Sequence, residues 1–148
     1  MGSGNHGAVG AFVAYNSGAI TQSYTTGDTG GLNASGGFVL GNTGTINESF
    51  ATGHLGIGGP AAPTSYSSIA VSNSGTINSN VYWNADNARR GYAVGYNFGT
   101  APPDINGLTT AQMSTPSNFV GWNFGLGGAW AMPAGATHPV LQWQQSKK

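Results

Sequence analysis

Apolar and polar positions follow one pattern that recurs along the first half of the chain. Within residues 10–27, a short apolar run at 12–15 is followed by Asn-Ser-Gly, and positions 19–24 then alternate between apolar and polar side chains. Short runs of this kind, bounded by a glycine-containing turn, predict two short strands joined by that turn. The same pattern returns at 36–53 and, in shortened form, at 68–82.

The three copies are offset by 26 and then by 31 residues. Self-similarity at such periods is typical of a solenoid, in which each copy is one coil stacked on the next at about 4.8 Å. Alignment of the copies predicts three apolar ladders and one polar ladder at the turn. Their members are Phe12, Phe38 and Ile69; Ile20, Ile46 and Ile77; Tyr24, Phe50 and Val81; and Asn16, Asn42 and Asn73.

The remainder of the chain lacks this periodicity. Two stretches rich in Gly, Asn and Pro, 55–67 and 84–100, are expected to be loop inserts in a solenoid that spans 10–100, after a flexible N-terminus at 1–9. Because solenoid ends expose unpaired backbone, residues 101–148 are expected to form a C-terminal cap.

Within this cap, helical turns are expected at 108–113, with Thr109 or Thr110 as N-cap, and at 116–119. The expected short strands and core tryptophans of the cap are 121–124, 129–132 and 139–143, with Trp122, Trp130 and Trp143.

Composition supports a folded chain with few charges. The chain has 148 residues, enough for one domain, and Asp, Glu, Lys and Arg make up 5% of it, against about 25% in an ordinary soluble protein. Aromatic and β-branched residues at regular positions argue against disorder. The zero net charge gives no electrostatic basis for binding nucleic acid or anionic lipid, and no apolar run is long enough to span a membrane.

The copies resemble the GLUG repeat of bacterial surface proteins, whose form is Gly-Gly-Leu-Val-Gly-x-Asn-x-Gly-x-Ile-x-x-Ser-Tyr-Ala-Thr-Gly. Residues 36–53 match it best, with Phe38 in place of Leu, whereas the third copy departs at Val81–Asn84. The tail from 107 to 143 is similar to the segment that often follows such repeats in filamentous-haemagglutinin-like and two-partner-secretion adhesins. The resemblance implies a secreted, cell-surface, all-β protein, a right-handed parallel β-helix of about three coils, with roles in cell adhesion and virulence.

Catalytic chemistry finds little support in the sequence. The carboxylates are Asp28, Glu48, Asp86 and Asp104, and no Ser/His/Asp spacing, metalloprotease motif or phosphate loop is present. The 26-residue offset places Asp28 beside His54, as an ion pair or a corner of a metal site. Asp86 with Asn84 and Asn87 is a conceivable calcium nucleus. No cofactor, metal site or enzymatic activity is predicted.

Aromatic side chains outside the ladders are the best candidates for ligand contact. Tyr15 and several residues of the two loop inserts are candidates for exposed platforms, which suit sugar rings beside Asn and Gln. The predicted glycan-binding residues are Tyr66, Tyr82, Trp83, Asn84, Tyr92, Tyr96 and Asn97.

The sequence therefore predicts a non-enzymatic segment of a secreted bacterial adhesin, acting as a stalk or as a module that binds glycans or host surfaces. The alternatives are a polysaccharide-active β-helix enzyme and an ice-binding solenoid. The first coil is expected to pair with a preceding coil of a longer parent chain. In the isolated chain, its open edge is expected to promote self-association.

Overall fold

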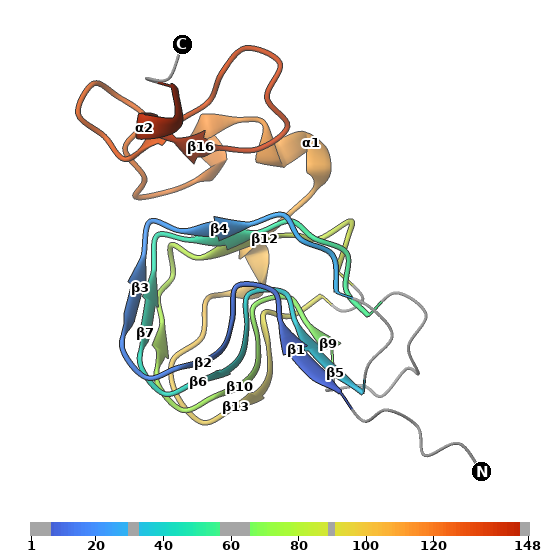
Figure 1. Ribbon diagram of the computed structural model, residues 1–148. Coiled ribbons are helices and arrows are strands. Elements are labelled where there is room, and N and C mark those ends of the chain that lie inside the picture. Colours follow the sequence, from blue (N-terminus) through green and yellow to red (C-terminus); the bar gives the residue numbers. More distant parts are fainter. Residues whose placement is uncertain (1–6, 30–32, 57–65, 89–90, 146–148) are drawn as a thin grey trace.

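The computed structural model describes residues 7–29, 33–56, 66–88 and 91–145, and the fold is mostly β with parallel sheets (Figure 1). Most of the expected flexible N-terminus 1–9 and most of the expected loop 55–67 lie outside these ranges. Both predictions are wrong at their ends, because Ala8 and Val9 pair in register with Ala34 and Ser35, and Tyr66 and Ser67 form a strand beside Ser35 and Gly36. The prediction of an all-β protein with parallel strand pairing is confirmed.

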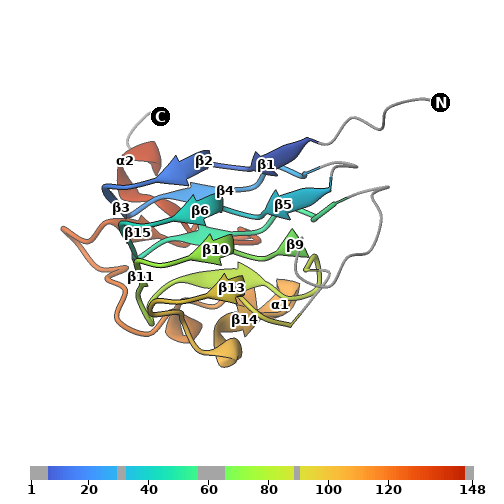
Figure 2. The same ribbon diagram turned by 90° about the horizontal axis from the view of Figure 1, so that it is seen from below.

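Four parallel sheets surround the core, and each takes one strand from successive passages of the chain. We call each passage a rung, and Figure 2 shows the rungs of the second sheet side by side. The sheets comprise, in order, β1 (Ala8–Gly10), β5 (Ala34–Gly36) and β9 (Tyr66–Ser67); β2 (Val13–Asn16), β6 (Val39–Asn42), β10 (Ala70–Asn73) and β13 (Val94–Asn97); β3 (Ala19–Thr21), β7 (Thr45–Asn47) and β11 (Thr76–Ile77); β4 (Tyr24–Thr25), β8 (Phe50–Ala51), β12 (Tyr82–Asn84) and β14 (Gly107–Leu108).

The described residues form four rungs, covering 8–25, 34–51, 66–84 and 94–108, where about three coils were expected. The expectation that 84–100 is a loop insert is wrong for β13, which pairs with β10 and brings Asn97 level with Asn73. Thr100 then bridges Thr76 in the third sheet. Rung 4 therefore runs to Leu108, beyond the cap boundary expected at 101.

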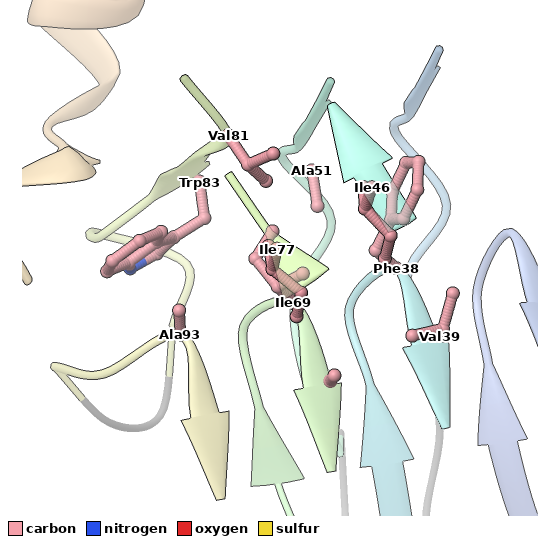
Figure 3. Close-up of a cluster of buried hydrophobic side chains, with 10 residues drawn as sticks. Phe38, Val39, Ile46, Ala51, Ile69, Ile77, Val81, Trp83 and Ala93 are labelled. Carbon is pink, nitrogen blue, oxygen red and sulfur yellow. The ribbon is translucent and has the colours of Figure 1, made fainter. Parts of the chain in front are cut away.

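Two of the expected apolar ladders fill the space inside the sheets (Figure 3). Phe12 stacks on Phe38 with ring centroids 4.8 Å apart, and Ile46 pairs in register with both Ile20 and Ile77. Phe38, Ile46 and Ile77 are fully buried. These ladders are confirmed.

The third expected ladder is wrong in its last member and in the side of the sheet on which its side chains lie. Tyr24 and Phe50 continue to Tyr82 rather than to Val81. The stretch from Ile77 to Tyr82 has one residue more than the stretch from Ile46 to Phe50, and this shifts the alignment. Phe50 and Tyr82 pack in a second cluster with aromatic residues of the C-terminal segment, whereas Val81 joins the internal core.

The C-terminal segment covers a side of the stack rather than an end: in Figure 1 it lies over the fourth sheet. After rung 4, which contains η1 (Asp104–Asn106), the elements of this segment are α1 (Thr110–Met113), η2 (Pro116–Asn118), an antiparallel pair of β15 (Trp130–Ala131) and β16 (Val140–Leu141), and α2 (Gln142–Gln145). The expected helical turns at 108–113 and 116–119 are confirmed, and Thr109 caps α1 through a capping box with Gln112.

Other expectations for this segment are corrected. Residues 121–124 form no strand, and the strand expected at 139–143 ends at Leu141, where α2 begins. Trp122 and Trp130 are core residues, as expected, with ring centroids 4.1 Å apart. Trp143 is 59% exposed because α2 lies at the surface, so its assignment to the core is wrong.

Four contacts show that the segment crosses the rungs in reverse order. Asn84 of rung 3 donates to Thr110, at the start of the segment. The Trp122 indole then donates to the Asn80 carbonyl of rung 3, and the Trp130 indole to Glu48 of rung 2. Finally, the Tyr24 hydroxyl of rung 1 donates to Gln144. The segment thus links rungs that are far apart in the sequence.

Candidate glycan-binding groove

Strand register places two rows of outward side chains on the second sheet, and both rows cross all four rungs. The first row consists of Tyr15, Gly41, Ser72 and Tyr96, which are directly paired neighbours. The second row follows the asparagines at the strand ends and consists of Ser17, Thr43, Ser74 and Phe98. Aromatic side chains therefore stand on the outer rungs, while the middle rungs carry small and hydroxyl side chains.

Between the aromatic residues lies a groove of about 320 Å³ that runs over rungs 1, 2 and 3 and reaches Phe98 of rung 4. Tyr15 is 72% exposed and Phe98 is 83% exposed, so both rings present apolar faces to solvent. The Tyr15 ring leans over Gly41, where an added Cβ would come within 2.9 Å of the ring. Glycine at position 41 is therefore needed for this ring position.

The asparagine ladder lies between the two rows and keeps them in register. Asn16 donates through its side-chain amide to Asn42, Asn42 to Asn73, and Asn73 to Asn97, each over 2.8 Å. The expected ladder is confirmed and gains Asn97 as a fourth member. Asn97, which is exposed, also donates to the Gly99 carbonyl in the turn, and its predicted ligand contact stays a prediction.

The groove is electrically neutral. The described residues that line it carry no ionisable side chain other than Tyr15, and its exposed polar side chains are those of Ser and Thr, since the asparagine amides are buried and bonded within the ladder. A neutral, hydroxyl-rich molecule with an apolar face can pack on the rings and form hydrogen bonds with the floor, whereas a charged ligand would find no opposite charge.

Three of the predicted glycan-contact residues are wrong as exposed platforms. Tyr66 and Trp83 are each 1% exposed and pack inside the molecule, while Tyr82 is 3% exposed beneath the C-terminal segment. Burial raises the pKa of the Tyr82 hydroxyl, although its hydrogen bond to the Val120 carbonyl acts in the opposite direction. Trp83 packs in the internal core cluster that also contains Ala93, and Tyr82 packs against aromatic residues of the C-terminal segment. The sequence predicted neither the fourth rung nor the position of this segment.

The remaining predicted residues fall into two groups. Asn84 is buried and bonded to Thr110, and Tyr92 is half-buried. Tyr96, 51% exposed, stands at the rung 4 end of the groove's first row. Phe98 was missed, and it could have been found, because aligning Asn97 with Asn73 places Phe98 in the row of Ser74.

The expected contact between Asp28 and His54 is present, and neither residue lines the groove. The His54 backbone N–H donates to the Asp28 carboxylate over 2.7 Å, and the His54 ring lies 3.2 Å away. This backbone hydrogen bond, followed by the ring hydrogen bond, holds the pKa of Asp28 below its ordinary value. Both side chains are about half exposed.

No metal centre accompanies this pair: across 7–29, 33–56, 66–88 and 91–145, no three His, Cys, Asp or Glu side chains come together as ligands. Asp86, the expected nucleus of a calcium site, instead accepts a hydrogen bond from the Thr110 backbone N–H over 2.7 Å. The Asn84 side chain accepts from the Asp86 backbone N–H. These polar groups therefore fix the start of α1 against rung 3.

Comparison with known proteins finds no matching family model, no matching curated protein and no matching solved structure. Within the described part of the chain, no helix is both long and apolar enough to cross a membrane. A function for the chain is therefore inferred from the geometry of the groove and from the repeat.

Proposed function

We propose that the chain is a non-enzymatic, glycan-binding segment of a secreted bacterial surface adhesin, folded as a right-handed parallel β-helix. The repeated order of the four sheets supports the β-helix, and the GLUG-like copies support the adhesin. The extracellular location follows from the same resemblance.

The observation that carries glycan binding is the uncharged groove, where Tyr15 and Phe98 come from the outer rungs and the mostly apolar surface between them carries a few Ser and Thr hydroxyls. A pyranose ring has an apolar C–H face, which packs on an aromatic ring, and equatorial hydroxyls, which exchange hydrogen bonds with Ser and Thr. Exposed aromatic residues beside Ser and Thr hydroxyls are therefore well suited to neutral sugars.

The placement of the acidic residues favours binding over hydrolysis. Glycoside hydrolysis ordinarily requires two carboxylates that flank the scissile bond. All four carboxylates of the chain belong to the described residues, and none lines the groove. Ice binding requires a flat array of regularly spaced threonines. The outward row of Thr45, Thr76 and Thr100 is only one threonine wide, and the adjacent row mixes Thr21 with Asn47 and Asn78, so the chain does not fit this alternative.

A glycan array with the wild-type chain and three variants tests the proposal. Tyr15→Ala and Phe98→Ala should each weaken binding about tenfold, since a lost ring contact and its burial are together worth about 1.4 kcal/mol. Trp143→Ala is the matched control, because Trp143 is an exposed aromatic residue outside the groove. A blank array, or turnover of a polysaccharide, would contradict the proposal.

A further inference from the structure

The shape of the groove indicates which glycans it takes, an inference that depends on the proposed glycan binding. We infer that its ligand is a linear, unbranched chain of neutral sugars that lies along the stack of rungs, with about one sugar unit per rung.

Direction follows from the lining. The groove takes the same two positions from each of rungs 1, 2 and 3, and Phe98 of rung 4 stands at its far end. It is therefore elongated across the strands, and the rungs that carry its two exposed aromatic residues lie three rung spacings apart, roughly 14 Å. The Tyr15 ring leans over Gly41 of rung 2, and a chain of several sugar units spans the distance from there to Phe98.

The period of the floor matches that of a polymer. Paired strands are about 4.8 Å apart, close to the length of one pyranose unit in an extended chain. Ser17, Thr43 and Ser74 are exposed residues at this spacing on one side of the groove. The Thr43 hydroxyl donates to the Asn16 carbonyl, so it can only accept a hydrogen bond from a ligand. A ligand with a repeating pattern of hydroxyls can therefore form similar contacts on successive rungs, whereas an irregular ligand cannot.

The floor of the groove disfavours branches that point toward it. Tyr15 leans over Gly41, and the asparagine ladder lies between the two rows. A substituent that points from an inner sugar unit toward this floor would meet the Tyr15 ring or lift the chain from the hydroxyl row. Because the lining carries no charged side chain, acidic or cationic sugars gain no compensating attraction.

The test is calorimetric titration of the wild-type chain with cello-oligosaccharides and N-acetylated chito-oligosaccharides of one to six units, which are all uncharged. Affinity should rise at least tenfold between two and four units, when one chain first contacts both aromatic ends, and should then level off. A xyloglucan oligosaccharide, which has the four-unit glucan backbone with branches, should bind at least tenfold more weakly than the unbranched four-unit chain.

Variants separate this inference from the proposed function. Tyr15→Ala and Phe98→Ala should each reduce four-unit binding to the two-unit level. Ser72→Trp, which fills the floor of the groove, should abolish it. Ser79→Trp is the matched control, since Ser79 is also an exposed serine of rung 3 but lies outside the groove. If binding is blocked by Ser72→Trp but is independent of chain length or branching, glycan binding stands and the linear arrangement is wrong. If no oligosaccharide binds and a glycan array is blank, both fail.

Discussion

At the scale of single residues, the turn asparagines do the most to hold the rungs in register. Asn42 is buried, accepts a hydrogen bond from Asn16 and donates one to Asn73. Its amide also donates to the Gly44 carbonyl, so its loss removes three hydrogen bonds, and each is worth about 0.5–1.5 kcal/mol. Asn97 ends the ladder, is exposed, and has a ladder partner on one side only.

Asn42→Ala should therefore lower the free energy of unfolding by about 2–4 kcal/mol, and Asn97→Ala by less than about 1 kcal/mol. Urea unfolding followed by far-UV circular dichroism measures both changes. Equal losses for the two variants would show that the ladder contributes no more in its buried middle than at its exposed end.

The contact between Asp28 and His54 makes stability depend on pH in a defined direction. The pKa of Asp28 is below its ordinary value of 3.8 in the folded chain, so the carboxylate stabilises the fold above that pH. The contribution is lost as the pH falls through the lower, folded-state pKa. The effect is small, because both side chains are about half exposed to solvent.

Asp28→Asn should accordingly melt slightly below the wild type at pH 7 and together with it at pH 2. Differential scanning calorimetry at both pH values measures this, with the exposed Asp104→Asn as control. A difference in melting temperature that persists unchanged at pH 2 would mean that the carboxylate charge is not its source.

At the scale of elements, the C-terminal segment is a strap over the fourth sheet. Trp130 is fully buried against Phe50, and its indole N–H donates to the Glu48 carboxylate over 3.0 Å. The same carboxylate accepts from Gln22 on the neighbouring rung. One acidic residue thus connects two rungs to the strap, which explains an acid within an otherwise uncharged surface.

Trp130→Phe should lower the free energy of unfolding by about 2 kcal/mol, since it removes a donor to a charged group and part of a buried ring. Trp143→Phe, the control on the exposed helix α2, should change it by less than about 0.5 kcal/mol. A double-mutant cycle with Glu48→Gln measures how much of this loss comes from the hydrogen bond between Trp130 and Glu48. A coupling energy of zero between positions 48 and 130 would contradict a stabilising hydrogen bond.

At the scale of the whole molecule, the described ends of the stack differ. Rung 1 pairs with another rung on one side only, and Phe12, stacked on Phe38, is 46% exposed. Rung 4 continues from its bridge at Thr100 into Pro102 and Pro103, which have no backbone N–H to offer a further strand. Rung 1 is therefore the better edge for pairing with a second copy.

We expect the chain to associate through rung 1, as a head-to-head dimer or short stack, because its low net charge offers little repulsion. Sedimentation velocity over a range of concentrations measures this. Phe12→Lys should shift the equilibrium to the monomer, whereas Ile105→Lys, at an exposed residue of rung 4, should not. A wild-type chain that stays monomeric at high concentration would contradict this expectation.

The sequence by itself determined what depends on local periodicity. Like-on-like stacking makes the copies align, so the ladders of Phe12 and Ile20, the asparagine ladder and the neighbouring positions of Asp28 and His54 could all be predicted. The Thr109 cap was also predictable, because a capping box involves only four consecutive residues. The fourth copy was present in the sequence too, since Val-Gly-Tyr-Asn at 94–97 repeats Val-Ala-Tyr-Asn at 13–16. Ala101 stands there in place of the ladder isoleucine and two prolines follow, which obscures the copy.

Only the tertiary structure decided which faces are covered. One extra residue before Tyr82 changes which side chains of rung 3 point inward, and no repeat relates the C-terminal segment to the sheet on which it packs. Tyr82 and Trp83 are therefore core residues, although the sequence alone suggested that they were exposed aromatic platforms. The groove arises in the same way: Tyr15 and Phe98 are 83 positions apart, and only the stacking of rungs brings them to one surface.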